Sequence, residues 1–313
     1  MTAVEHKHVE ANGLTFHVAV GGPPDAPPVL CLHGFPEGWM SWRPLMDALP
    51  DASVHAPDLP GYPRTTGMRQ RYDVFTLTDD IRALIMALGL TRPVLVGLDW
   101  GGALAWIFAH RYSDLIGQLV VVNCPHPKTL TRALLHNTDL QTFRAVGAPF
   151  LLVPRVPEWL FTTRLGRRGL RLSFLIREGQ KGTMDRALVD EIVAQYQKPE
   201  DMRGPINYYR EIVRTMLTRS RRTQLEAIYT TPISVPVTMV WGMEDGLLPA
   251  EVALGSEKDA GRPVAWRPLD GVGHFVDLEA SGKLAEELRR VLGPSSGVDH
   301  NSFGGGVDRI NRR

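Results

Sequence analysis

The chain has 313 residues, and its composition limits the classes of protein it can belong to. Lys and Arg number 35 against 34 Asp and Glu, so the net charge is +1, and 43% of the residues are hydrophobic. This balance supplies no overall field to attract nucleic acid or an anionic membrane, and the length allows one large core with a smaller second unit. We therefore expect a small neutral or apolar partner, with no nucleic acid and no membrane. The oligomeric state stays open.

Cysteine usage and the N-terminus bear on the compartment. Cys31 and Cys124 are the two cysteines, and each stands in an apolar run, which predicts two buried thiols rather than a disulfide framework or a metal site. The first residues lack an apolar core of signal-peptide length, and no run reaches the roughly 18 apolar residues of a spanning helix. We expect a cytoplasmic protein. Because there is no phosphate loop, dinucleotide fingerprint or clustered metal ligand set, we expect no cofactor and no metal.

The first part of the chain alternates short apolar runs with helical patterns. Continuous apolar runs suit strands buried on both faces, and their alternation with helices indicates βαβ units. The sequence thus predicts an α/β fold with a mostly parallel central sheet flanked by helices. The predicted strands are 15–20, 28–33, 54–57, 93–97 and 119–123, and the predicted helices are 77–88 and 101–110.

The alternation of strands and helices stops in the middle of the chain. Residues 129–231 carry 17 Lys and Arg against 10 Asp and Glu and show helical patterns, and a strand pattern resumes at 235–241. We interpret 129–231 as a helical cap inserted between two core segments, 1–128 and 232–293, and its arginine runs as a solvated face. Residues 294–313 are rich in Gly and Ser with few large apolar side chains, which predicts a disordered tail.

Asp99 stands in a tight turn between a strand and a helix. The segment Gly97-Leu-Asp-Trp-Gly-Gly102 follows the strand 93–97 and opens the helix 101–110, which is the context of a nucleophile elbow. The small flanking residues permit close backbone approach, and the helix N-terminus favours an ionised carboxylate. A carboxylate there attacks saturated carbon and leaves an alkyl ester on the enzyme. We predict that Asp99 is the nucleophile, and the alternative is a structural helix cap.

A base and an acid follow Asp99 along the chain. His274 lies in the loop segment 271–275, ahead of a helical pattern at 284–292, and the near-neutral pKa of an imidazole suits it to activating water. Asp245 and its neighbour Glu244 follow a predicted strand, at the sheet edge where open α/β sheets place their sites. Either carboxylate can orient His274 and stabilise its imidazolium form.

Backbone N–H groups beside Asp99 complete the predicted site. The segment His33-Gly-Phe-Pro-Glu37 ends the strand 28–33. The N–H of Phe35 can therefore join the N–H of Trp100 in an oxyanion hole that serves the hydrolysis of an ester. We interpret His33 itself as structural.

These motifs resemble the epoxide hydrolase branch of the α/β-hydrolase fold. The resemblance implies that fold, with nucleophile, acid and base in the order Asp99, Asp245 and His274, and it favours Asp245 over Glu244. It also implies that Asp99 opens a small apolar epoxide and that water, activated by His274 and Asp245, releases a vicinal diol. The resemblance covers about residues 9–293 and rests on His33-Gly-Phe-Pro-Glu37 with Ser41-Trp-Arg43, Gly97-x-Asp99-Trp-Gly-Gly102, Trp241-Gly-x-x-Asp245 and Gly273-His-Phe275.

The cap contains a candidate proton donor. Asn207-Tyr-Tyr-Arg210 is similar to the family's Asn-aromatic-Tyr-Arg motif, which puts Tyr209 in the role of protonating the alkoxide that ring opening forms. A phenol suits this role because it donates while remaining neutral. We expect the neighbouring Tyr208 to pack inside the protein. Where the family usually offers a second cap tyrosine, this chain has Val146-Gly-Ala148.

Two other functions remain open from the sequence. A haloalkane dehalogenase shares the Asp nucleophile but needs two donors for the halide; Trp100 can supply one, Phe35 cannot supply the second, and Trp159 is the remaining substitute. A non-catalytic ligand-binding protein would retain the fold and its pocket. The missing second tyrosine favours such a protein, whereas the complete triad favours an enzyme. In each case we expect an apolar pocket, lined by Phe35, Trp100, Tyr209, Phe150 and Trp159.

Overall fold

The computed structural model describes residues 2–67, 71–136 and 148–293. The predicted tail, 294–313, and part of the predicted cap, 137–147, lie outside these residues. In the described part, eight strands form one sheet in the order β1-β2-β4-β3-β5-β6-β7-β8. The strands are β1 (Val4–Ala11), β2 (Leu14–Gly21), β3 (Pro28–Leu32), β4 (Ser53–Pro57), β5 (Val94–Leu98), β6 (Gln118–Val122), β7 (Val237–Gly242) and β8 (Val264–Leu269).

The sheet is mostly parallel, as the sequence predicts. The five neighbouring pairs from β4 through β3, β5, β6 and β7 to β8 are parallel, and only β1 with β2 and β2 with β4 are antiparallel. The central strands β5 and β7 are buried along their whole length. This burial explains their unbroken apolar sequences, because a parallel strand is covered by helices on both faces.

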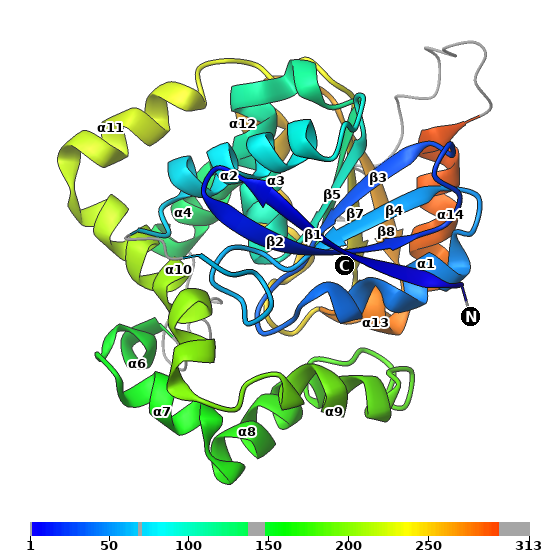
Figure 1. The fold of residues 1–313 in the computed structure, drawn as a ribbon. Coiled ribbons are helices and arrows are strands. Elements are labelled where there is room, and N and C mark those ends of the chain that lie inside the picture. Colours follow the sequence, from blue (N-terminus) through cyan, green and yellow to red (C-terminus); the bar gives the residue numbers. More distant parts are fainter. Residues whose placement is uncertain (1, 68–70, 137–147, 294–313) are drawn as a thin grey trace.

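Helices cover both faces of the sheet (Figure 1). On one face α1 packs against α14, and on the other α2 packs against α3. The α/β-hydrolase fold predicted from the sequence is therefore confirmed. The helices of the core are α1 (Arg43–Ala48), α2 (Val74–Ala87), α3 (Trp100–Tyr112), α12 (Ser256–Ala260), α13 (Val276–Glu279) and α14 (Ser281–Leu292).

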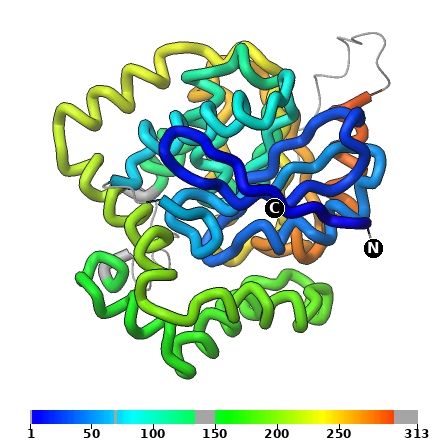
Figure 2. Tube along the Cα trace, viewed as in Figure 1, coloured from blue at the N-terminus to red at the C-terminus, as the bar shows by residue number. Residues whose placement is uncertain are grey.

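Between β6 and β7 the described residues form helices and no strand. In Figure 2 most of this part of the chain, coloured green to yellow, stands off to one side of the sheet. The bounds of the cap, expected at 129 and 231, stay predictions, and the first helix of the segment, α4 (Pro127–His136), packs against α3 and α12 of the core. The other helices between β6 and β7 are α6 (Ala148–Leu152), α7 (Val156–Thr162), α8 (Arg164–Leu175), α9 (Arg186–Ala194), α10 (Pro199–Leu217) and α11 (Arg219–Ile228).

Helix α10 lies directly against a loop of the core. A side chain at Gly204 would place its Cβ 2.2 Å from the carbonyl oxygen of Gly61, so the two backbones touch where only glycine fits. Four residues along the same helix, the Tyr208 hydroxyl donates a hydrogen bond of 2.9 Å to the carbonyl of Pro60. These contacts fix the position of α10 and of the residues beside Tyr208.

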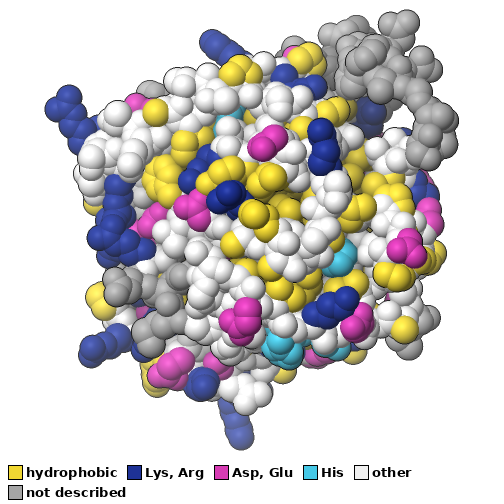
Figure 3. All heavy atoms as spheres, turned by 45° about the horizontal axis from the view of Figure 1, so that its top comes forward, with side chains coloured by type: hydrophobic (Ala, Val, Ile, Leu, Met, Phe, Trp, Pro, Cys, Tyr) yellow, Lys and Arg dark blue, Asp and Glu magenta, His cyan; other side chains and the backbone are white. Residues whose placement is uncertain are grey.

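The cysteines and the surface charges follow the sequence-based expectations. Cys31 and Cys124 are free and buried, as predicted. None of the helices in the described ranges is long and apolar enough to cross a bilayer. On the face shown in Figure 3, cationic and acidic side chains are interspersed among hydrophobic ones, as a net charge near zero suggests.

Candidate active site

Asp99 occupies a strained turn between β5 and α3. Its φ is 51° and its ψ is −117°, a conformation that costs energy for a residue with a side chain and that is common at functional sites. The turn is tight because a Cβ at Gly97 would lie 2.3 Å from the carbonyl oxygen of Gly101, and one at Gly101 would lie 2.0 Å from that of Leu32. The glycine frame therefore holds Asp99 at the N-terminus of α3, where the helix dipole favours its charge.

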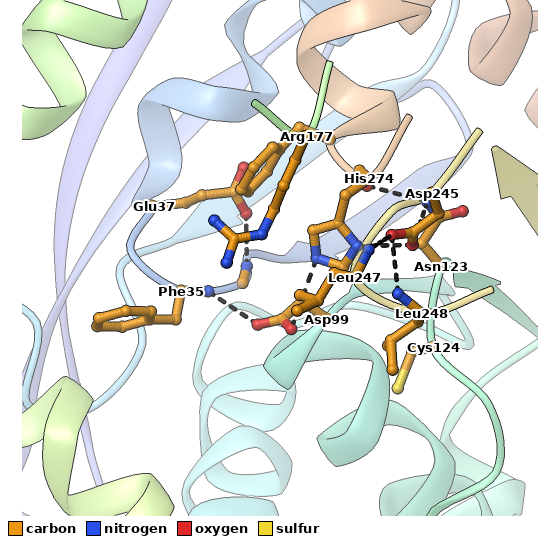
Figure 4. A network of polar contacts seen from close by, with 12 residues as sticks. Phe35, Glu37, Asp99, Asn123, Cys124, Arg177, Asp245, Leu247, Leu248 and His274 are labelled. Carbon is orange, nitrogen blue, oxygen red and sulfur yellow. Dashed lines mark hydrogen bonds and ion pairs between the residues drawn. The ribbon is translucent and has the colours of Figure 1, made fainter. Parts of the chain in front are cut away.

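The carboxylate of Asp99 contacts both of its predicted neighbours (Figure 4). The backbone N–H of Phe35 donates to Oδ1 over 3.0 Å, and Nε2 of His274 lies 3.7 Å from Oδ2. The side chain of Asp99 remains 15% exposed, whereas that of His274 is 1% exposed. Asp99, the predicted nucleophile, is thus the member of the group that a substrate can reach.

Asp245 contacts the ring nitrogen of His274 that faces away from Asp99. This nitrogen, Nδ1, lies 2.7 Å from Oδ2 of Asp245, while the backbone N–H groups of Leu247 and Leu248 donate to the other oxygen over 2.8 and 2.9 Å. The proton on Nδ1 is therefore assigned to the hydrogen bond with Asp245. This bond orients the imidazole ring so that Nε2 faces Asp99. Three separate loops of the core converge here: one after β5, one after β7 and one after β8.

The charges around His274 set its pKa. Burial alone lowers the pKa of this imidazole, but the carboxylates of Asp245 and Asp99 outweigh the burial and raise the pKa to about 10. At neutral pH His274 therefore carries a proton on each nitrogen and pairs with both carboxylates. The resting site is an ion-paired Asp99–His274–Asp245 chain.

Asn123, which the sequence analysis did not single out, connects the acid and base loops. Its Nδ2 donates to Oδ2 of Asp245 over 3.0 Å, to the carbonyl of Gly273 over 2.9 Å and to that of His274 over 3.1 Å. Its Oδ1 accepts from the N–H of Gly242 over 2.7 Å. The available signal was a polar residue closing the apolar run 119–123, which is unusual in a buried strand.

Tyr209 of α10 reaches the site from the cap. Its ring meets the Trp100 ring edge-on with centroids 4.9 Å apart and the Phe35 ring at 5.5 Å. Burial and the charge of Asp99 raise the pKa of Tyr209, and a hydrogen bond from the Trp100 side chain acts in the opposite direction. The phenol therefore stays protonated beside the nucleophile.

The next residue, Arg210, connects α10 to α6 and α7. Its guanidinium pairs with the buried carboxylate of Glu158 and donates to the carbonyls of Leu151 and Val153 over 3.0 and 2.7 Å. A planar fork with five donors suits this multiple contact. Arg210 thus fixes the part of α10 that presents Tyr209.

Three other tyrosines near the site donate their hydroxyls to backbone carbonyls. Tyr62 donates to Gly34 over 3.3 Å, Tyr196 to Glu37 over 3.2 Å and Tyr208 to Pro60. Tyr208 is 1% exposed, so the expectation that it packs inside is confirmed. Of the expected second-tyrosine segment, Val146 and Gly147 lie outside the described residues and Ala148 begins α6.

The predicted pocket lining is only partly brought together. Phe35 packs on Phe161 with centroids 6.4 Å apart, and Phe161 packs on Phe150 at 5.9 Å, so Phe150 joins the aromatic group through a residue that the sequence analysis did not name. Trp159 does not join it. Its side chain is 60% exposed, because the helical spacing on α7 turns residues 159 and 161 to different sides.

Comparison with known proteins identifies the class. The family model described as "alpha/beta hydrolase fold" matches residues 27–280, and the chain therefore belongs to the α/β hydrolase fold family. This agrees with the sheet, the elbow and the loops described above.

Individual relatives confirm the resemblance to epoxide hydrolases. "Epoxide hydrolase 4" of Mus musculus is 32% identical over 252 residues, which are 78% of this chain and 67% of that protein. The "AB hydrolase superfamily protein YfhM" of Bacillus subtilis is 30% identical over 276 residues, 82% of this chain and 87% of that protein. Among solved structures, epoxide hydrolase VrEH1 from Vigna radiata has a TM-score of 0.73 at 25% identity, covering 92% of this chain and 97% of that one.

Proposed function

We propose that this protein hydrolyses small apolar epoxides to vicinal diols through an alkyl ester on Asp99. The observation that carries the proposal is a partly exposed carboxylate, Asp99, beside a buried His274–Asp245 pair. Nε2 of His274 lies 3.7 Å from Oδ2 of Asp99, and Nδ1 of His274 lies 2.7 Å from Oδ2 of Asp245. The names of the relatives support the substrate class.

In the first step Asp99 attacks a ring carbon of the epoxide. A new bond forms between the carboxylate and that carbon, the carbon–oxygen bond of the ring breaks, and the oxygen takes the proton of Tyr209. The phenol of Tyr209, whose pKa is raised, still holds its proton when the alkoxide forms, and the alkoxide takes that proton because it is a stronger base than a phenolate. The aromatic rings of Phe35 and Phe161 supply an apolar surface for the substrate.

Ester formation prepares the second step by changing the charge beside His274. Asp99 loses its negative charge on alkylation, and with it His274 loses one of the two carboxylates that raise its pKa. The imidazolium can then release its proton, which returns to the phenolate that the first step leaves on Tyr209, and the neutral imidazole takes a proton from water. The resulting hydroxide attacks the ester carbonyl, the bond between that carbon and the diol oxygen breaks, the new carboxylic acid of Asp99 gives its proton to that oxygen, and the diol leaves with the Asp99 carboxylate restored.

The negative oxygen of the tetrahedral intermediate needs donors. The N–H of Phe35 already lies 3.0 Å from Oδ1 of Asp99, and the N–H of Trp100, the first residue of α3, is our second candidate. Neither a cofactor nor a metal is required for these steps.

The available donors disfavour dehalogenation. A halide site needs two donors for the leaving ion, and the Trp100 indole can supply one. Phe35 offers no side-chain donor, and Trp159, the substitute considered from the sequence, faces solvent.

The test combines turnover with trapping. The purified protein is assayed with styrene oxide and a panel of aliphatic epoxides, and the His274→Gln variant is analysed by mass spectrometry after mixing with the same compounds. We expect diol from the parent protein and a stable adduct on Asp99 in the variant. The control is Glu244→Gln, which should retain turnover. Absence of both diol and adduct across the panel would reject the proposal in favour of a binding protein.

A further inference from the structure

Most of the exposed large hydrophobic side chains lie in one part of the cap. Ten such side chains occur in the described residues, and seven of them fall between residues 152 and 176, where α6, α7 and α8 follow one another. Figure 1 shows α6, α7 and α8 below α10 in the view. We call this set the outer cap patch: Leu152 (39% exposed), Val153 (43%), Val156 (46%), Trp159 (60%), Leu165 (72%), Leu172 (56%) and Ile176 (67%).

Helix α8 carries apolar residues on two separate faces. Gly166, Leu170 and Phe174 are buried, and the Phe174 ring packs on Phe275 of the core. Leu165 and Leu172, in contrast, lie seven residues apart on a face turned to solvent. Ile176, at the end of the helix, extends this exposed stripe by one turn. Burial of the first face explains why the helix docks on the protein, but it leaves the second face without a protein partner among the described residues.

The charge of the same segment has one sign. Residues 150–177 contain six arginines and a single carboxylate, Glu158. That carboxylate is buried and paired with Arg210, so the segment exposes no negative side chain. Arg155, Arg164 and Arg168 are exposed and form no ion pair with any described residue. The net charge of +1 for the whole chain therefore conceals a strongly cationic region.

We propose that the outer cap patch binds an anionic lipid surface, with α8 lying in the plane of the membrane interface. A helix that presents leucine and isoleucine beside free arginines matches an interfacial helix, whose apolar side chains enter the acyl boundary while its cations meet lipid headgroups. Trp159 adds an aromatic ring of the kind that prefers this boundary. Arginine side chains can extend along the apolar surface and keep their charge in the headgroup layer.

A second copy of the chain fits the patch less well. In a twofold dimer the same surface meets itself, which would bring the guanidinium groups of Arg164 and Arg168 toward their own copies. The segment exposes no carboxylate to pair with them. Lipid phosphates and serine headgroups supply the missing negative charge, and an epoxide that dissolves in a bilayer would be presented to the cap at the same surface. The binding proposal itself does not rest on the proposed hydrolysis.

The experiment is co-sedimentation of the purified protein with vesicles of phosphatidylcholine alone and of phosphatidylcholine mixed with phosphatidylserine. We expect binding to the mixed vesicles that falls at least tenfold in high salt. The triple variant Leu165→Ser, Leu172→Ser, Ile176→Ser and the double variant Arg164→Gln, Arg168→Gln should each lower the affinity by a similar factor. Turnover of a water-soluble epoxide, measured without vesicles, should be unchanged in both variants.

Matched controls come from the other end of the cap. Leu217 is 82% exposed and Arg219 is exposed at the start of α11, so Leu217→Ser and Arg219→Gln should leave vesicle binding unchanged. Equal losses in these controls, or no binding to mixed vesicles, would overturn the proposal. A concentration-dependent dimer in light scattering that the triple serine variant abolishes would assign the patch to a second copy instead.

Discussion

Replacing Asn123 by alanine should destabilise the protein and disturb the catalytic loops together. The side chain is fully buried and makes four hydrogen bonds, three as donor and one as acceptor. Its loss leaves the N–H of Gly242 without its acceptor and the carbonyls of Gly273 and His274 without that donor. A buried polar group left unpaired costs about 1–3 kcal/mol, and because water can enter part of the space, we expect a total of about 3 kcal/mol.

The backbone of Asn123 adds a second contribution that a control can isolate. Its φ is 43°, which asparagine tolerates better than alanine and glycine tolerates best. Asn123→Gly removes the same hydrogen bonds without the backbone penalty, so it should be more stable than Asn123→Ala by about 1 kcal/mol. The assay is urea unfolding followed by fluorescence, with epoxide turnover measured at a concentration of urea that leaves both variants folded.

The two readouts separate stability from positioning. If Asn123 aligns His274 through Asp245, turnover in the folded variants falls by more than the folded fraction does. A loss of stability below about 1 kcal/mol for Asn123→Ala would show that the hydrogen bonds contribute little. It would refute the reasoning that this residue fixes the geometry of the two loops.

Three further predictions follow from the site. In Asp99→Asn, the midpoint of the His274 titration measured by NMR should fall from about 10, because one of the two neighbouring carboxylates is gone. The stability that protonation of His274 supplies is lost as pH rises through that midpoint, so this loss of stability should move to lower pH. An unchanged midpoint would contradict the prediction. Tyr209→Phe should slow ester formation about 100-fold or more in single-turnover assays. The rate of the parent protein should not fall near the ordinary tyrosine pKa, since the pKa of Tyr209 is raised. Equal rates of ester formation in the parent and the variant would exclude Tyr209 as the donor. Gly101→Ala should lower the free energy of unfolding by about 3 kcal/mol, because its Cβ would lie 2.0 Å from the carbonyl oxygen of Leu32. The control is Gly282→Ala, whose Cβ meets no atom within 4 Å and should leave stability unchanged. Similar shifts of the melting temperature in the two variants would contradict the packing argument.

The sequence predicted the parallel strands β3, β4, β5, β6 and β7 because they are buried on both faces, whereas the half-buried parallel edge strand β8 was not predicted. Strands such as β5 and β7 must be continuously apolar, and this leaves a clear signal. The edge strand β1 was not predicted. Strand β1 is half exposed, and five of its eight residues are charged or histidine, so its polar composition hides the strand pattern.

The candidate catalytic residues stand out in the sequence, whereas the residues that position them do not. Asp99 is marked by the glycines that its tight turn requires, which are local in sequence. Asn123 and Arg210 act through partners more than 50 residues away in the chain. Contacts of that range depend on how the loops meet in space. The exposure of Trp159 was not predicted either, because a shift of one position along a helix decides whether a side chain faces the pocket or solvent.

The measurement that tests the central claim most directly is a single turnover in heavy-oxygen water, followed by mass spectrometry of the peptide that contains Asp99. If Asp99 forms the ester and water attacks its carbonyl carbon, one heavy oxygen enters the Asp99 carboxylate and the diol formed in that turnover carries none. Heavy oxygen in the diol, with none in Asp99, would mean that water attacks the epoxide directly and would contradict the account.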